Sequence, residues 1–316
     1  MTFPVFDLHC DTLSRLLGRN MDSYGSLNDN DCHISLRRGR KLPGYAQCFA
    51  CFTTDLWEGK SSVSAVQAFE RQIVQFQREM NNHPDIEIAY SAADVANHLE
   101  KGIMSGILTI EGPAGFGFDP ALLEDLALAG FRMTSLGWNE KNVLTGSNVT
   151  GGGLTDLGKE YVKQAQTQGM IVDVSHISDE GFWDIMECTE KPVVASHSNS
   201  RAIWDHSRNL TDDMFKALCQ TGGVAGINLY SAFLGESPDI NTVCDHIFHF
   251  LEMDPSGTHI ALGGDLDGCD SLPSGFEGVD DYPAVAACLR ARGLTDEIIR
   301  NIFWNNALGV MQKCCM

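Results

Sequence analysis

Short apolar runs alternate with longer amphipathic segments along the whole chain. Each short run is bounded by turn-forming residues and is almost continuously apolar, as expected of a parallel strand that is buried on both faces. The runs lie at residues 5–9, 46–52, 106–110, 132–136, 171–175, 193–196, 223–229 and 259–263. We therefore predict eight parallel strands.

The segments between these runs carry apolar residues at three- and four-residue steps, which is typical of amphipathic helices. They lie at residues 62–81, 120–129, 154–168, 179–188, 212–221, 241–253 and 282–292, and a closing helix is expected over 295–311. The alternation predicts a (β/α)8 barrel of the TIM type, formed by residues 1–316 as a single domain. A doubly wound open sheet is the alternative, but no G-x-G-x-x-G follows the first strand.

The composition narrows the classes of partner. The 316 residues include 42 acidic and 22 basic side chains, a net charge of −20, and 43% are hydrophobic. This acidic excess argues against binding to nucleic acid or to an anionic membrane. The N-terminus has no signal-peptide pattern, and no apolar run reaches the roughly 18 residues of a membrane helix. With 11 cysteines, an odd number, we expect free thiols and a cytoplasmic protein.

Polar residues stand at the carboxyl ends of the first, third, fifth, sixth and eighth predicted strands. They are His9, Asp11, Glu111, His176, His197 and Asp265. Taken alone, His176 is more often a hydrogen-bonded loop residue than a ligand, and Asp11 suits a helix N-cap. Together, however, the six residues meet at the face where barrel enzymes build their active sites. Three imidazoles and three carboxylates at one place predict a site for two divalent ions, most naturally zinc.

These motifs, in this order, resemble the membrane (renal) dipeptidase family, peptidase family M19 of the amidohydrolase superfamily. The resemblance runs from about residue 6 to residue 311. It is carried by DLHCDT at 7–12, EG at 111–112, DVSH at 173–176, SHSNSR at 196–201, SRNLTDD at 207–213 and GGDLDG at 263–268. Each piece is weak alone, but their order and combination are specific.

The resemblance implies two zinc ions per chain. His9 and Asp11 would bind one ion, His176 and His197 would bind the other, and Glu111 would bridge them together with a water or hydroxide. The resemblance also favours a homodimer.

Further residues match the substrate machinery of the family. Asp265 matches the acid that contacts the bridging water, Arg208 matches the arginine that receives the terminal carboxylate of the substrate, and Tyr230 falls where members line the pocket. Animal members carry a histidine after the fourth strand that helps to stabilise the tetrahedral intermediate. This sequence has Trp138 at that place, and Asn139 is a candidate replacement donor.

The implied activity is that of a metallo-dipeptidase, in which a metal-bridging hydroxide attacks the scissile carbonyl and Asp265 acts first as base and then as acid. Arg208 would select dipeptides, with L,D-dipeptides among the expected substrates. One alternative is another amidohydrolase reaction on a small carboxylate-bearing amide, as in an N-acyl amino acid deacylase or a lactonase. A more remote alternative is an inactive barrel that acts as a binding protein, although neither a ligand nor Asp265 is missing.

Overall fold

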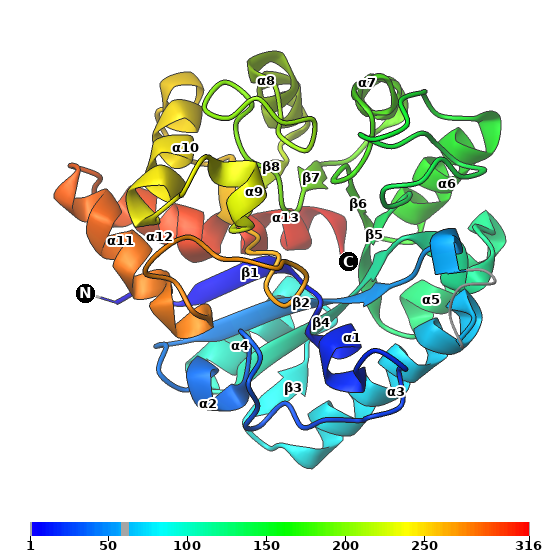
Figure 1. The fold of residues 1–316 in the computed structure, drawn as a ribbon, viewed down its shortest axis with the longest axis horizontal. Helices are drawn as coiled ribbons and strands as arrows, with labels where there is room; N and C mark the ends of the chain where they lie inside the picture. The colour runs from blue at the N-terminus through cyan, green and yellow to red at the C-terminus, as the bar shows by residue number, and fades with distance from the viewer. Residues whose placement is uncertain (1, 58–62, 316) are drawn as a thin grey trace.

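A computed structural model describes residues 2–57 and 63–315. Its parallel strands close into a barrel because β2 pairs with both β1 and β4 (Figure 1). The barrel strands are β1 (Val5–Cys10), β2 (Tyr45–Phe52), β4 (Met104–Glu111), β5 (Phe131–Ser135), β6 (Ile171–Asp173), β7 (Val193–Ala195), β8 (Val224–Ile227) and β9 (Ile260–Leu262). The predicted (β/α)8 fold is confirmed, and each predicted strand is present.

A further strand, β3 (Ile86–Ile88), was not predicted. Among the described strands it pairs only with the start of β4, and it lies outside the closed barrel. Three residues with one exposed glutamate between two isoleucines do not make a recognisable apolar run. The strands predicted over 171–175 and 193–196 also end early. The reason is that the backbone N–H groups of Ser175 and Ser196 donate to the side chain of Asp173 instead of continuing a strand ladder.

Helices surround the barrel. They are α1 (Thr12–Leu17), α2 (Leu36–Gly39), α3 (Ala65–Asn82), α4 (Ala92–Lys101), α5 (Leu123–Leu128), α6 (Asp156–Thr167), α7 (Asp179–Cys188), α8 (Asp212–Thr221), α9 (Ser231–Leu234), α10 (Ile240–Met253), α11 (Tyr282–Ala291), α12 (Asp296–Arg300) and α13 (Asn306–Cys314). The predictions for α7 and α8 match at both ends. The start predicted for α3, at Ser62, lies outside the described residues. Helices α1, α2, α4 and α9 were missed.

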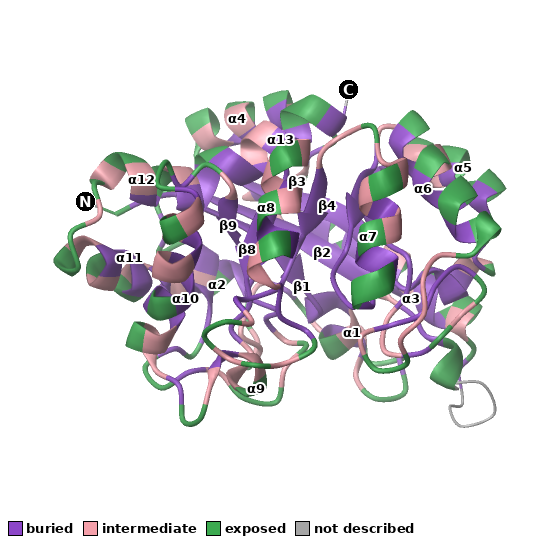
Figure 2. Cartoon of the chain, turned by 90° about the horizontal axis from the view of Figure 1, so that it is seen from above, coloured by how far each residue is buried: buried purple, intermediate pink, exposed green. Residues whose placement is uncertain are grey.

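The C-terminal segment closes one end of the barrel. The predicted single helix is divided into α12, a π-helical turn (Asn301–Asn305) and α13. Side chains of α13 such as Val310 and Met311 pack with inward-facing strand residues such as Phe6 and Ala261. Figure 2 shows α13 and α4 at one end of the barrel, and α1, α9 and several loops at the other. The opposite end is therefore left for the site.

All 11 cysteines are free thiols. Cys48 and Cys51, the one C-x-x-C of the sequence, are buried in β2, and neither belongs to a group of potential metal ligands among residues 2–57 and 63–315. No helix in the described parts of the chain, residues 2–57 and 63–315, has both the length and the apolar character needed to cross a membrane.

Candidate metal centre

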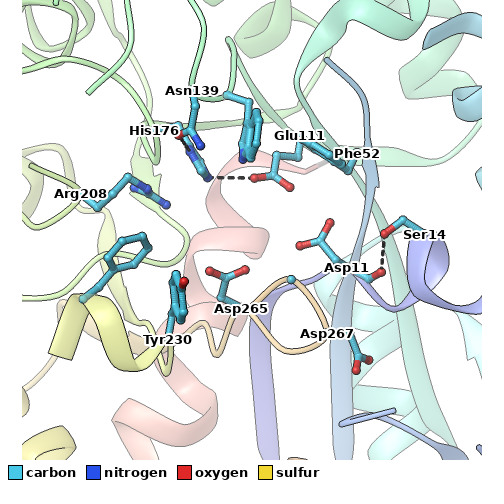
Figure 3. A pocket seen from close by; sticks show the side chains of 13 residues that line it. Asp11, Ser14, Phe52, Glu111, Asn139, His176, Arg208, Tyr230, Asp265 and Asp267 are labelled. Carbon is cyan, nitrogen blue, oxygen red and sulfur yellow. Dashed lines mark hydrogen bonds and ion pairs between the residues drawn. The ribbon is translucent and has the colours of Figure 1, made fainter. Parts of the chain in front are cut away.

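The six polar side chains predicted from the strand ends meet at the carboxyl end of the barrel, with Glu111 in the middle. One oxygen of Glu111, Oε1, lies 2.9 Å from Nε2 of His176 (Figure 3), and Oε2 lies 3.4 Å from Nε2 of His9. The same His9 atom lies 3.3 Å from Oδ2 of Asp11 and 3.9 Å from Oδ1 of Asp265. Glu111 thus contacts both halves of the cluster.

His197 completes the group. Its Nε2 lies 3.0 Å from Nε2 of His176, and its ring stacks on that of His9 at a centroid distance of 3.9 Å. Donor atoms of His9, Glu111 and His197 all lie within 4.8 Å of one another, as do those of His9, Asp11 and Asp265. All six residues are buried, with at most 9% of any of them exposed.

The chemistry of this cluster fits divalent metal ions. Oδ1 of Asp11 is buried without a hydrogen-bond partner among the described residues. Burial, followed by the nearby Asp11 carboxylate, raises the pKa of Glu111 to about 7, and burial raises that of Asp265 to about 6. Buried carboxylates that are this costly to ionise are stabilised by a cation. Imidazole nitrogens and carboxylate oxygens are zinc ligands.

The histidines divide into two electrostatic classes. Burial lowers the pKa values of His176 and His197 well below the usual value, so both are neutral and each offers a lone pair. Burial also lowers the pKa of His9, but the adjacent Glu111 and Asp11 outweigh it and raise that pKa well above the usual value. In the metal-free protein His9 is therefore protonated, and its positive charge lies where a metal cation would be favoured.

A pocket of about 250 Å³ opens in front of the cluster. On one side the rings of Phe52 and Trp138 meet edge to face, with centroids 5.1 Å apart. Arg208 and Tyr230 line the pocket as well. Figure 3 shows Arg208 and Phe52 on opposite sides of the carboxylate cluster. The pocket thus has the Arg208 guanidinium at one end and the Phe52 ring at the other, and the rings of Tyr230 and Phe233 also line it.

Arg208 is a buried cation for which no ion pair is found among residues 2–57 and 63–315. Only 5% of it is exposed, and its Nε and Nη2 atoms have no hydrogen-bond partner among the described residues. Its guanidinium lies 5.4 Å from the ring centroid of Phe233. Burial lowers the pKa of Arg208, while Asp265 and Glu111 act in the opposite direction. An unpaired guanidinium at a pocket is suited to bidentate binding of a carboxylate.

The family model described as membrane dipeptidase, peptidase family M19, matches residues 1–315. The chain belongs to this family. The resemblance inferred from the sequence motifs is therefore confirmed.

Several individual relatives are similar to this member of the M19 family. A Schizosaccharomyces pombe protein described as an uncharacterised dipeptidase is 35% identical over 221 residues, which are 68% of this chain but only 53% of that protein. A Klebsiella pneumoniae protein from the pqqA 5′ region is 33% identical over 243 residues, 72% of this chain and 89% of that protein. The Claviceps purpurea dipeptidase tcpJ is 29% identical over 254 residues, 77% of this chain and 59% of that protein.

Solved structures show the same fold. The metallopeptidase dipeptidase AC, of family M19, superposes with a TM-score of 0.90 at 25% identity, covering 100% of this chain and 99% of that one. A Rhodobacter sphaeroides metallopeptidase, solved with a phosphinate mimic of the dipeptide L-Ala-D-Ala, has a TM-score of 0.90 at 24% identity and covers 99% of this chain.

Local backbone geometry aims the cluster residues of this M19 chain. His176 and Asp265 adopt left-handed backbone conformations, with φ of 70° and 55°. Such conformations are uncommon outside glycine and concentrate at functional sites. Strand β1 also shifts its register against β2 between Asp7 and Cys10. Phe6 and Leu8 belong to the barrel interior, so strict alternation would turn His9 outward. The irregularity re-aims His9 to the barrel mouth.

Two buried aspartates that the sequence reasoning left without a role hold the cluster in place. Asp7 accepts hydrogen bonds from the backbone N–H groups of His9, at 2.9 Å, and Gly264, at 3.0 Å, and thereby joins β1 to the segment after β9. Asp173 accepts from the N–H groups of Ser175 and Ser196, each at 2.9 Å, and joins β6 to β7. In the sequence, both residues could have been recognised as charged side chains inside otherwise apolar strands.

The histidines also have partners behind the cluster. Nδ1 of His176 lies 3.1 Å from Oδ1 of Asn139, and Nδ1 of His197 lies 2.6 Å from Oγ of Ser196. When Nε2 binds a metal, the ring proton is on Nδ1, and an acceptor there fixes the orientation of the imidazole. Oδ1 of Asn139 can accept the Nδ1 proton of His176. The side-chain NH2 group of Asn139 then remains as a hydrogen-bond donor.

The remaining predicted pocket residues are also at the site. Trp138, Asn139 and Tyr230 all line the pocket. Asp267 lines it too, but its carboxylate accepts hydrogen bonds from Oγ1 of Thr12, at 2.6 Å, and from the backbone N–H of His33, at 2.7 Å. These bonds indicate that Asp267 stabilises the loop that contains it and does not act as a second base.

Proposed function

We propose that this M19 chain is a dinuclear zinc dipeptidase that hydrolyses the peptide bond of dipeptides, L,D-dipeptides included. The observation that carries the proposal is the buried guanidinium of Arg208, whose Nε and Nη2 atoms have no hydrogen-bond partner among the described residues. It lines the same pocket as the cluster of three histidines and three carboxylates. The cluster is suited to metal-assisted hydrolysis, and the cation is suited to binding a free carboxylate. Together they indicate a small substrate with a C-terminal carboxylate.

Five side chains would hold the zinc ions. His9 and Asp11 would bind one, His176 and His197 the other, and Glu111 would bridge them. The bridging role is supported by the two oxygens of Glu111, which lie 2.9 Å from His176 and 3.4 Å from His9. When bound, two such ions lower the pKa of a shared water towards neutrality and polarise the scissile carbonyl.

Asp265 would carry the proton. Its Oδ1 faces His9 at 3.9 Å, on the cluster side of the pocket. Burial raises its pKa to about 6, and a general base works best when its pKa lies near the operating pH. Asp265 takes the proton from the attacking water and returns it to the leaving amine.

Arg208 would bind the C-terminal carboxylate of the substrate. An internal residue of a longer peptide has no free carboxylate, so the contact favours dipeptides. It recognises the carboxylate and not the side chain on the same carbon, which is why L,D-dipeptides are included. Tyr230 would line the same subsite. The NH2 group of Asn139 would donate to the scissile carbonyl oxygen, in place of the histidine of animal members.

The N-terminal residue of the substrate would lie towards the opposite end of the pocket. With the carboxylate on Arg208 and the scissile carbonyl at the cluster, the chain direction leads towards the Phe52 and Trp138 rings. These rings offer apolar contact to the side chain of that residue.

A substrate panel tests the proposed function. The purified chain is assayed, with zinc added and after chelation, against L,L- and L,D-dipeptides, C-terminally amidated dipeptides, N-acyl amino acids and lactones. We expect hydrolysis of free dipeptides, its loss on chelation and its return with zinc. Equal hydrolysis of amidated dipeptides, or faster turnover of N-acyl amino acids or lactones, would contradict the proposal.

A further inference from the structure

Asn228 lies directly after β8, is fully buried and is absent from the set of residues predicted above. Its side-chain Nδ2 donates two hydrogen bonds. One goes to Oδ2 of Asp265 at 3.0 Å, and the other goes to the backbone carbonyl oxygen of His197 at 3.2 Å. A single amide group therefore connects the proposed proton carrier with a proposed zinc ligand.

The side-chain oxygen and the backbone groups of Asn228 are also held by hydrogen bonds. Its Oδ1 accepts a hydrogen bond from the backbone N–H of Tyr230 at 2.6 Å. Its backbone N–H donates to Oδ1 of Asn199 at 2.9 Å, and its backbone carbonyl accepts from Nδ2 of Asn199 at 3.0 Å.

The orientation of the Asn228 amide follows from these partners. A flipped amide would place Oδ1 against a carboxylate and a carbonyl, both of which are acceptors, and Nδ2 against an N–H donor. Only the observed orientation satisfies all three contacts.

These contacts make the two oxygens of Asp265 unequal. Asn228 holds Oδ2, whereas Oδ1 faces His9 in the cluster at 3.9 Å. Among residues 2–57 and 63–315, no other side chain donates a hydrogen bond to this carboxylate. Without Asn228, the carboxylate would lose this restraint and could rotate about the side-chain bonds of Asp265.

We propose that Asn228 is a positioning residue that holds Oδ2 of Asp265 so that Oδ1 stays directed at the metal cluster. The inference rests on the proposed function, in which Asp265 moves the proton. Asn228 does not touch the substrate in this scheme, and its effect passes through Asp265. Removing its side chain is therefore expected to slow turnover and to leave substrate affinity and zinc content unchanged.

A double-mutant cycle on the zinc-loaded protein tests this role. Asn228→Ala should lower kcat by about 10- to 100-fold, the usual effect of removing a residue that orients an active-site group, with KM and zinc content unchanged. Combining it with Asp265→Asn should add no further loss beyond that of Asp265→Asn alone, because the group that Asn228 orients no longer carries the proton.

Asn306→Ala is the matched control. Asn306 is also buried, and its Nδ2 also donates two hydrogen bonds, to the carbonyl oxygens of Gly257 at 2.6 Å and Ile260 at 2.7 Å, away from the cluster. This variant should lower the melting temperature without changing kcat. Asn228→Ser, whose hydroxyl is too short to reach Asp265, is the second variant should Asn228→Ala fail to fold.

Two results would overturn the positioning role. One is an unchanged kcat in both Asn228 variants. The other is a loss that multiplies with that of Asp265→Asn, which would show that Asn228 acts independently of Asp265. A normal kcat in Asp265→Asn alone would instead contradict the proposed function.

Discussion

The Nε2 atoms of His176 and His197 lie only 3.0 Å apart. Burial lowers the pKa values of both imidazoles well below the usual value, so both rings are neutral. Two neutral imidazoles this close can share one proton, whereas a divalent cation would use the lone pair of each.

Zinc should stabilise the protein more strongly as the pH rises. In the metal-free fold, Glu111 and Asp265 have pKa values raised to about 7 and about 6. Between the ordinary carboxyl pKa values and these raised values, the folded state therefore binds more protons than the unfolded state. The stability of the metal-free protein consequently falls as the pH rises through that window. Zinc needs the deprotonated ligands, so its stabilising effect grows over the same window.

Thermal unfolding checks this prediction. The difference in Tm between zinc-loaded and chelator-treated protein should be larger at about pH 7.5 than at about pH 5.5. Glu111→Gln should remove most of that pH dependence. A zinc-induced rise in Tm that is equal at the two pH values would speak against zinc ligation by Glu111.

Asp265→Asn should keep both metal ions and lose most turnover. The amide matches the carboxylate in shape but cannot accept the proton of the attacking water. We expect kcat to fall by about 10²- to 10⁴-fold, the range of a general acid–base contribution. Steady-state kinetics and metal analysis on the same preparation check this. Normal kcat with full metal content would exclude the proton-carrying role.

Arg208→Ala should damage dipeptide hydrolysis selectively. Removing one partner of a buried charged hydrogen-bonded pair costs about 2–5 kcal/mol, which corresponds to a loss of roughly 30-fold to several thousand-fold in kcat/KM. An ester substrate without a carboxylate should lose far less, because it has nothing to bind to the guanidinium. Equal losses on the two substrates would argue against the carboxylate contact.

Trp138→Ala should change the preference for the N-terminal residue of the substrate. Trp138 packs edge to face on Phe52 at 5.1 Å, and losing this apolar contact should lower kcat/KM for Leu- or Phe-containing dipeptides by about 10- to 100-fold. Dipeptides with N-terminal glycine should change little. Trp183→Ala, which removes a tryptophan 42% exposed on α7, is the matched control. A uniform loss over all dipeptides would contradict the assignment.

Much of the fold could be predicted because parallel barrel strands are buried on both faces and leave continuous apolar runs. The short β3 left no such run, since its central Glu87 is exposed. The predicted ends of β6 and β7 were wrong for a different reason, which concerns where the two strands actually end. They depend on Asp173, which takes the N–H groups of Ser175 and Ser196 out of the strand ladder, and that contact exists only once the two strands are side by side.

The site shows the same division. Histidines and acidic residues that follow apolar runs can be recognised from the sequence alone. The structure brings all six of these predicted cluster residues together. Asp7 and Asn228 were missed because their importance comes from cross-strand hydrogen bonds, to Gly264 and to Asp265 respectively. Such partners are set by strand register and by local irregularities, as in β1 between Asp7 and Cys10.

Zinc titration of the metal-free chain, with bound metal and dipeptide hydrolysis followed together, tests the central claim most directly. The proposed dinuclear site predicts that the chain binds two zinc ions and that hydrolysis of a free dipeptide reaches its plateau at about two equivalents. Glu111→Gln should bind zinc less tightly and show little activity. Full activity of the metal-free chain, or tight zinc binding without hydrolysis of any dipeptide, would contradict the account.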